Sequence, residues 1–419
     1  MKKILSLKNY RNYGLSISLG TIAARLLTLA IYWYVLETTE SVTALAVTGF
    51  VQSLPALFSI VVSKFADKYN AKVIIIFSEF LRGSITILIL LNIFTLNSIV
   101  IIIGLNMLIE FAELLHTSSS TNIIPSIVNE KKIEQGVGTS NAIMSISGLV
   151  GVAFGGIIYE NYGAISLFLI AAILFAGSIV FGMKIQIARS KVKEDAEDNG
   201  IEEIKEESEI SLKKTIKYIF TNSLLLRIVL VALIVNISFS AFDIVLTVHV
   251  HNTLDQGAQI YGIMSGSLML GMIVGSILIG VITEKLKFSV SSLVLIGFVS
   301  CGIFLVLLGV IDVWILGILF IFGIGFFMAV IDSAVDSWLL RIIPEDIRGS
   351  VLNMLTALFS ISLPIGNALF GFLLNKLNSS VLFALMGGIV IIGIIIFQIT
   401  GMKESVNKEI LLSDTEKQN

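Results

Sequence analysis

Long apolar runs alternate with short polar turns along the whole chain. Each run is close to the about 20 residues that a helix needs to cross a bilayer core. None shows the ten-residue alternation of a membrane β-barrel strand. The pattern therefore predicts an all-α integral membrane protein with twelve transmembrane helices. They are expected near residues 12–36, 42–62, 73–95, 98–121, 138–159, 164–184, 223–248, 258–282, 289–310, 313–340, 351–374 and 380–402.

Composition supports a membrane protein. Of the 419 residues, 56% are hydrophobic and 14% are charged, whereas a soluble domain carries roughly 25% charged residues. The first apolar run is too long for a cleavable signal peptide, so an uncleaved first helix is expected. The net charge of −2 gives no sign of a nucleic-acid partner, and the single Cys301 lies in an apolar run and forms no internal disulfide.

Basic residues are distributed unequally between the two sets of loops. The connections at 37–41, 92–97, 160–163, 249–257 and 311–312 contain no Lys or Arg, and the one at 375–379 contains only Lys376. The other set holds nearly all the loop lysines and arginines. Because positive loops stay in the cytoplasm, both termini are predicted to be cytoplasmic.

The apolar runs form two groups of six, separated by a polar stretch, and this arrangement predicts four regions. Residues 1–184 form an N-terminal six-helix bundle, 185–222 a cytoplasmic linker, 223–402 a C-terminal six-helix bundle, and 403–419 a cytoplasmic tail. Within the linker, 194–209 contains nine acidic residues and one Lys, which is typical of a solvated tether, and a partner-binding role stays open. The stretch 212–220 predicts an amphipathic helix on the membrane surface.

The two halves repeat each other in sequence. "SISGLVGVAFGG" (145–156) aligns without gaps with "SISLPIGNALFG" (360–371), and "IIPS" (123–126) aligns with "IIPE" (342–345). "SKFADKYNAK" (63–72) aligns with "GVITEKLKFS" (280–289), which places Asp67–Lys68 on Glu284–Lys285. Six helices per half give both halves the same orientation, so the repeat is parallel, about an axis along the membrane normal.

With these features the chain resembles the major facilitator superfamily over essentially its whole length. "SKFADKYNAK" is similar to that family's loop signature G-x-L-A-D-R-x-G-R-K, with Ser63, Asn70 and Ala71 departing from it. The resemblance implies a conformational latch at the cytoplasmic side, because an ion pair at an interface can form in one state and break in another. The latch residues are Asp67, Lys68, Lys72, Glu284 and Lys285.

The fifth segment resembles the antiporter pattern g-x8-G-x3-G-P-x2-G-G of drug/proton exporters. The matching glycines are Gly138, Gly151, Gly155 and Gly156, while Ser147 replaces a Gly and Val152 replaces the Pro. The resemblance implies antiport. Close helix packing is an equally good account of these glycines.

Three further stretches are most similar to the bacterial macrolide-efflux and siderophore-export group: "VLETTESVTALA" (35–46), "HTSSSTNIIPSIVNEKKI" (116–133) and "PEDIRGSVLNMLTALFSISLPIG" (344–366). This resemblance implies efflux, drug resistance and a bacterial inner (plasma) membrane location. One departure is that Ile109 holds the place of an Arg often found in the fourth helix of drug/proton antiporters.

Ionisable residues inside the apolar runs are the candidate functional groups, because they cost about 2.5–3.5 kcal/mol on insertion scales and usually face a cavity or a partner. Glu113 lies twelve residues before Pro125, and Asp332 lies twelve residues before Pro344. The repeat therefore predicts that they are a symmetric pair, on opposite sides of the central cavity that the family resemblance implies. Such a carboxylate suits proton coupling. His116, one turn from Glu113, could share the proton, and a packed polar side chain near the inner helix end is an equally good account of it. The full set is Arg25, Glu110, Glu113, His116, Asp243, Asp332 and Asp336.

Other polar residues receive structural interpretations. Glu79 and Arg82 are expected to form a salt bridge beside the 63–72 loop, and His249 and His251 are expected on the outer surface. No His, Cys or carboxylate cluster predicts a metal site. Without a Walker A loop or a nucleophile–base motif, neither an enzyme nor a cofactor is predicted.

The favoured function is a monomeric secondary transporter that exports an amphipathic compound, a macrolide-like drug or a secreted metabolite, in exchange for protons. Trp33, Tyr34, Met144 and Trp338 are candidate cavity residues, although lipid-facing or interfacial positions are the more common place for each of them. Two alternatives stay open. One is a lysolipid flippase on the same fold, and the other is a non-transporting membrane immunity or sensor protein that acts through a partner.

Overall fold

The structure is a computed structural model that describes residues 4, 6–129, 132–186, 215–216, 218–286, 290–344 and 347–399. All regular secondary structure in these ranges is helical. The acidic stretch 194–209 and the tail 403–419 lie outside the described residues, as do Lys213 and Lys214 of the predicted amphipathic helix.

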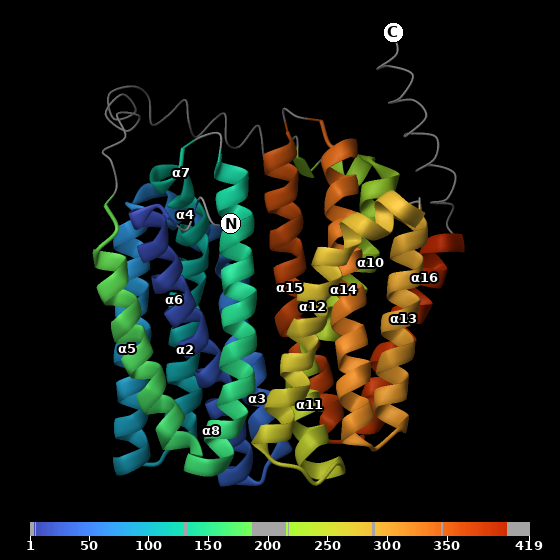
Figure 1. Ribbon diagram of the computed structural model, residues 1–419. Coiled ribbons are helices and arrows are strands. Elements are labelled where there is room, and N and C mark those ends of the chain that lie inside the picture. Colours follow the sequence, from blue (N-terminus) through green and yellow to red (C-terminus); the bar gives the residue numbers. More distant parts are fainter. Residues whose placement is uncertain are drawn as a thin grey trace.

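The N-terminal half is built from α2 to α8 (Figure 1). Pro55 lacks the N–H that a continuous helix needs, and the second apolar run is accordingly divided around it. The long helix α8 contains one residue with non-helical backbone, Gly163 at φ 75°, where it breaks into two arms. The elements are α2 (Lys8–Thr39), α3 (Val42–Ser53), η1 (Leu54–Phe58), α4 (Ser59–Lys68), α5 (Ala71–Thr95), α6 (Ile99–Asn122), α7 (Ile124–Ile127) and α8 (Ile133–Met183).

The C-terminal half follows the same plan. Its first span is interrupted at Ala241, between α10 and α11, and ends in a short π-helical turn, η4. Interrupted helices and π-turns are found in membrane proteins where helices line a cavity or rearrange. The elements are α10 (Ser223–Ser240), α11 (Phe242–Val248), η4 (His249–Thr253), α12 (Ala258–Leu286), α13 (Val290–Val310), α14 (Trp314–Ile342), α15 (Arg348–Leu374) and α16 (Ser379–Ile399).

The predicted number of membrane spans is confirmed within the described ranges. Ten helices are long and apolar enough to cross a bilayer, and a shorter apolar helix covers Ser379–Ile395. One of the ten, Gln135–Met183, contains the break at Gly163 and therefore supplies two spans. Counting it twice and adding the shorter helix gives twelve, six in each half.

The halves meet at the end of the bundle that holds the connections near residues 40, 160, 255 and 376, here called the outer end. Gly156 of α8 lies against Gly262 of α12, and Gly371 of α15 lies against Ala46 of α3. Asn367 Nδ2 also donates to the Gly49 carbonyl at 3.2 Å. Gly156 and Gly371 are equivalent in the sequence repeat, so the two interface contacts obey the same pseudo-symmetry.

Toward the opposite end, here called the terminal end, the two halves diverge (Figure 1). The N-terminus lies at this end. A Cβ added at Gly138, in the first arm of α8, or at Gly349, in α15, would meet nothing within 4 Å. The close contacts that Gly156 and Gly371 make between the halves thus lie at the outer end.

Candidate functional site

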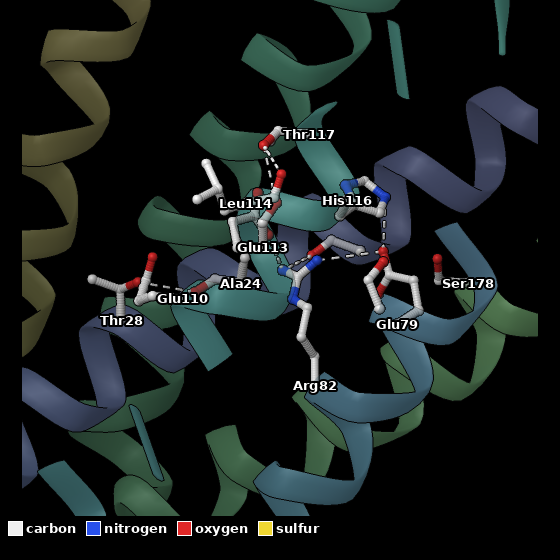
Figure 2. A network of polar contacts seen from close by, with 12 residues as sticks. Ala24, Thr28, Glu79, Arg82, Glu110, Glu113, Leu114, His116, Thr117 and Ser178 are labelled. Atoms are coloured by element: carbon white, nitrogen blue, oxygen red, sulfur yellow. Dashed lines mark hydrogen bonds and ion pairs between the residues drawn. The ribbon is translucent and has the colours of Figure 1, made fainter. Parts of the chain in front are cut away.

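Four ionisable side chains meet between α5 and α6, inside the N-terminal half (Figure 2). Glu79 and Arg82 come from α5, and Glu113 and His116 come from α6. Residues three apart lie on the same face of a helix, so each pair projects toward the neighbouring helix. This cluster is called the ion network below.

The ion network is a chain of alternating acidic and basic groups. Arg82 Nη2 lies 2.7 Å from Glu113 Oε2, and Arg82 Nη1 lies 3.4 Å from Glu79 Oε1. The same Glu79 oxygen lies 3.1 Å from His116 Nε2. The order is therefore Glu113, Arg82, Glu79, His116, with Arg82 shared between two carboxylates.

Only one member of the ion network reaches open space. The side chains of Glu79, Arg82 and His116 are 0%, 1% and 4% exposed, whereas that of Glu113 is 33% exposed. A charge removed from water needs a partner close by. Glu113 is therefore the member that water, a proton or a substrate can reach directly.

Neighbouring groups fix the position of Arg82. Its guanidinium carbon lies 4.6 Å from the centre of the Phe175 ring, a cation–π contact. Its Nη2 also donates to the Gly20 carbonyl of α2 at 3.4 Å. Gly20 has a second function, because a Cβ there would collide with the Glu79 carboxylate. The absence of a side chain on α2 thus makes room for the buried acid.

Glu110 lies one turn before Glu113 and has a different partner. Its Oε1 accepts a hydrogen bond of 2.7 Å from Gln52 Nε2 of α3. Arg25 of α2 is exposed and close enough to act electrostatically on both Glu110 and Asp243 of α11. In the described part of the chain, neither Arg25 nor Asp243 has an ion-pair partner within 4 Å.

Asp332, the predicted symmetry mate of Glu113, has different surroundings. It lies on α14, is exposed, and has Asp336 and the buried Cys301 of α13 within electrostatic range. No Lys or Arg of the described residues pairs with it within 4 Å. The counter-ion that holds Glu113 thus has no counterpart beside Asp332, and the two acids differ chemically despite their equivalent positions in the repeat.

The predicted latch is described only in part. Lys72 Nζ donates to the Met183 carbonyl at 2.9 Å, which links the start of α5 to the end of α8. Lys68 is exposed in the last turn of α4. The side chains of Asp67, Glu284 and Lys285 lie outside the described part of the structure.

The predicted helix-5 glycines have separate surroundings. Gly151 lies against Ile22 and Arg25 of α2, and Gly155 lies against Leu26 and Leu29. Gly156 instead faces the other half, at Ala258 and Gly262 of α12. Gly138 faces open space. Three of the four therefore permit close helix approach, as the packing account of the motif requires.

The predicted Glu79–Arg82 salt bridge is confirmed, and it is buried in the ion network. The predicted surface position of His249 is wrong. Its side chain is 0% exposed, because its ring packs edge-on against Phe383 and its Nδ1 bonds Ser379 Oγ at 3.1 Å. Trp33 and Trp338 are buried among other side chains.

Sequence reasoning also missed the partner of Glu113. Arg82 of the neighbouring helix α5, which the sequence paired only with Glu79, is the counter-ion of Glu113. Sequence reasoning expected His116 to act with Glu113, but the imidazole contacts Glu79. One feature of the sequence could have indicated these contacts. Two consecutive apolar runs each contain two ionisable residues three positions apart, at 79 and 82 and at 113 and 116.

Two six-helix halves that enclose buried charges and pack against each other through glycines define the class of membrane transporters that work by alternating access. The chain belongs to the Major Facilitator Superfamily, whose sequence profile matches residues 13–331 and 253–411. It is a multi-pass membrane protein, and the family points to a transporter rather than an enzyme.

Solved structures show the same fold at low sequence identity. A variant of the nucleoside transporter NupG superposes with a TM-score of 0.74 at 12% identity, covering 94% of this chain and 99% of that one. A bacterial homologue of the human lysosomal transporter Spinster, in an inward-facing and unoccupied conformation, gives 0.67 at 12% identity, covering 93% and 94%. No curated protein sequence matches the chain.

Proposed function

We propose that the chain is a proton-coupled exporter of a small amphipathic compound. It acts as a monomer in a bacterial plasma membrane with both termini in the cytoplasm. The observation that carries the proposal is the 2.7 Å ion pair between Arg82 and Glu113, in which a buried guanidinium holds a carboxylate that is 33% exposed. Such a pair responds to protonation, because a neutral carboxylic acid no longer balances the guanidinium charge.

Protonation of Glu113 changes the balance of contacts inside the N-terminal half. Arg82 then has Glu79 as its remaining anionic partner, at 3.4 Å from Nη1. The energetic difference between the two pairings can bias two conformations of the halves. In the proposed cycle Glu113 takes a proton from outside, the substrate leaves, and the proton is released to the cytoplasm.

The interface between the halves supports alternating access. Small residues close the outer end, where Gly156 meets Gly262 and Gly371 meets Ala46. Interfaces made of small residues allow close approach without interlocked long side chains, so they can separate as rigid surfaces. The proposed conformational cycle opens this end while the terminal end closes.

The substrate class rests on resemblance and on three charges between the halves. The stretches similar to the macrolide-efflux group favour an amphipathic compound that enters from the cytoplasm or the inner leaflet. Arg25 lies within electrostatic range of both Glu110 and Asp243, so one positive and two negative formal charges are near one another's helices. We include a macrolide-like drug and a secreted metabolite in the proposed class.

The test uses inverted membrane vesicles with an acidic interior and a fluorescent pH-gradient probe. Macrolides, cationic dyes and siderophores are added to the wild type, Glu113→Gln and Asp332→Asn. Asp312→Asn at the outer end is the control, because Asp312 is an exposed acid outside the ion network, in the loop between α13 and α14. We expect substrate-dependent proton release in the wild type and the control, and its loss in Glu113→Gln.

The Asp332→Asn result shows whether the second acid participates. Loss of proton release in both acid variants supports the symmetric pair, whereas loss in Glu113→Gln alone places coupling in the ion network. Unchanged release in both variants would refute the proposed coupling site. No response of the wild type to any compound would refute the proposed substrate class.

A further inference from the structure

We propose that His116 holds the coupling proton while Glu113 is ion-paired to Arg82, and that Glu79 is the residue that positions it there. This inference rests on the proposed function and adds a second location for the proton. It follows from the charge balance, the order of contacts and the hydrogen-bond partners of the imidazole.

The four side chains of the ion network sum to zero charge only with one proton beyond those fixed on Arg82. Two carboxylates and one guanidinium sum to one negative charge if His116 is neutral. Three of the four side chains are at most 4% exposed, and an unbalanced charge is costly where water cannot solvate it. One added proton makes the network neutral, and it can reside on either Glu113 or His116.

The order of contacts indicates which location accompanies the observed ion pair. With Glu113 ionised and bound to Arg82, the series Glu113, Arg82, Glu79, His116 alternates in sign only if His116 is an imidazolium. Its Nε2 lies 3.1 Å from Glu79 Oε1. Glu79 then has a cation on either side, as a fully buried carboxylate needs.

The second ring nitrogen also faces an acceptor. His116 Nδ1 lies 3.5 Å from Ser120 Oγ, and Ser120 donates its own proton to the His116 carbonyl at 2.8 Å. The Ser120 oxygen is therefore left as an acceptor toward Nδ1. Both nitrogens of an imidazolium are donors, so the surroundings of His116 fit the protonated ring on both sides.

The groups around His116 come from α2, α5 and α6, and α8 adds Ser178, whose side chain bonds Glu79. α5 contributes Glu79 and, through it, Arg82, and α6 contributes Glu113 on the far side of Arg82. From α2, the Tyr13 hydroxyl donates to the Ser120 carbonyl at 3.0 Å. Figure 2 shows His116 and Glu113 on opposite sides of the Arg82 guanidinium.

Two neutral states of the ion network follow. In one, the proton is on His116 and Glu113 is bound to Arg82. In the other, the proton is on Glu113, His116 is neutral, and Arg82 is balanced by Glu79 alone. Exchange between them conserves the number of protons. It moves one positive charge from His116 at the buried end of the network to the partly exposed Glu113, which suits one proton per transport cycle.

The protonation of His116 can be measured directly because the chain has only three histidines. Full-length protein labelled with ¹⁵N-histidine in nanodiscs is titrated between pH 5 and 9, and the His116→Gln spectrum assigns the His116 signal. In Glu79→Gln the adjacent anion is lost, so the ¹⁵N signals of His116 at a given pH should differ from those of the wild type. In the control Asp312→Asn they should be unchanged.

Two results would overturn the inference. One is a wild-type His116 that stays neutral throughout the titration. The other is an identical His116 titration in the wild type and Glu79→Gln. Circular dichroism and size-exclusion profiles of each variant establish that the fold is retained, so that a shift reports the local charge.

Transport separates this inference from the proposed function. In His116→Gln the amide retains a donor toward Glu79 but cannot release a proton, so we expect substrate exchange to persist while substrate-dependent proton release falls at least tenfold. If the wild type shows no proton release, the proposed function fails, and the titration still decides whether Glu79 and His116 form the expected pair. Full proton release in His116→Gln would refute its role as a proton site.

Discussion

At the scale of single residues, the ion network depends on a position that carries no charge. Gly20 of α2 leaves room for the Glu79 carboxylate, which a Cβ would strike. We expect Gly20→Ala to displace Glu79 and to lengthen its contacts with Arg82 and His116, at an overpacking cost of about 1–3 kcal/mol. Substrate-dependent proton release should fall while the protein still inserts and purifies.

The matched control is Gly104→Ala on α6, where a Cβ would meet nothing within 4 Å. Thermal unfolding in detergent and the vesicle assay would be run on both variants. Equal behaviour of the two alanine variants would show that the space at Gly20 has no influence on the network.

At the scale of elements, the contact between α8 and α12 is expected to set the closure of the outer end. A Cβ at Gly156 would collide with the Ala258 carbonyl, which is backbone and cannot rotate away. We expect Gly156→Ala to weaken the outer contact and to raise the labelling rate of a cysteine introduced at Asn161 at least severalfold.

The control lies in the same helix and the same sequence motif. A Cβ at Gly138 would meet open space at the terminal end, so Gly138→Ala should leave the labelling rate at Asn161 unchanged. If both variants raised the rate equally, the effect would come from helix propensity and not from the interface.

At the scale of the whole molecule, the proposed cycle requires opposite movements at the two ends. Spin labels at Asn141 and Thr356 report on the terminal end, and labels at Asn161 and Lys376 report on the outer end. Each pair is related by the sequence repeat, and all four positions are exposed. When a transported compound is added, we expect the first distance to shorten and the second to lengthen, as measured by pulsed electron resonance.

Background labelling is a minor concern, because the one native cysteine, Cys301, is buried. A change at only one end would contradict rigid rocking of the halves and would favour a local gate. Invariant distances with every compound would favour a binding protein without transport.

The sequence alone determined the number of spans, the all-helical architecture and the parallel repeat of two halves. Each depends on a property that acts locally along the chain: a bilayer requires about 20 apolar residues per helix and leaves only helices or closed barrels as spanning structures. It also pointed to Glu113 and His116, because an ionisable residue within an apolar run is conspicuous whatever it contacts.

The tertiary structure decided which charges are partners. The pairing of Arg82 with Glu113, and of His116 with Glu79, depends on how α5 and α6 are rotated about their axes. The burial of His249 depends on the approach of α16 to the end of η4. Sequence spacing places residues on a face of one helix, but the neighbour of that face is set by packing between helices, and this is why the chain of four charges could be seen only in the folded protein.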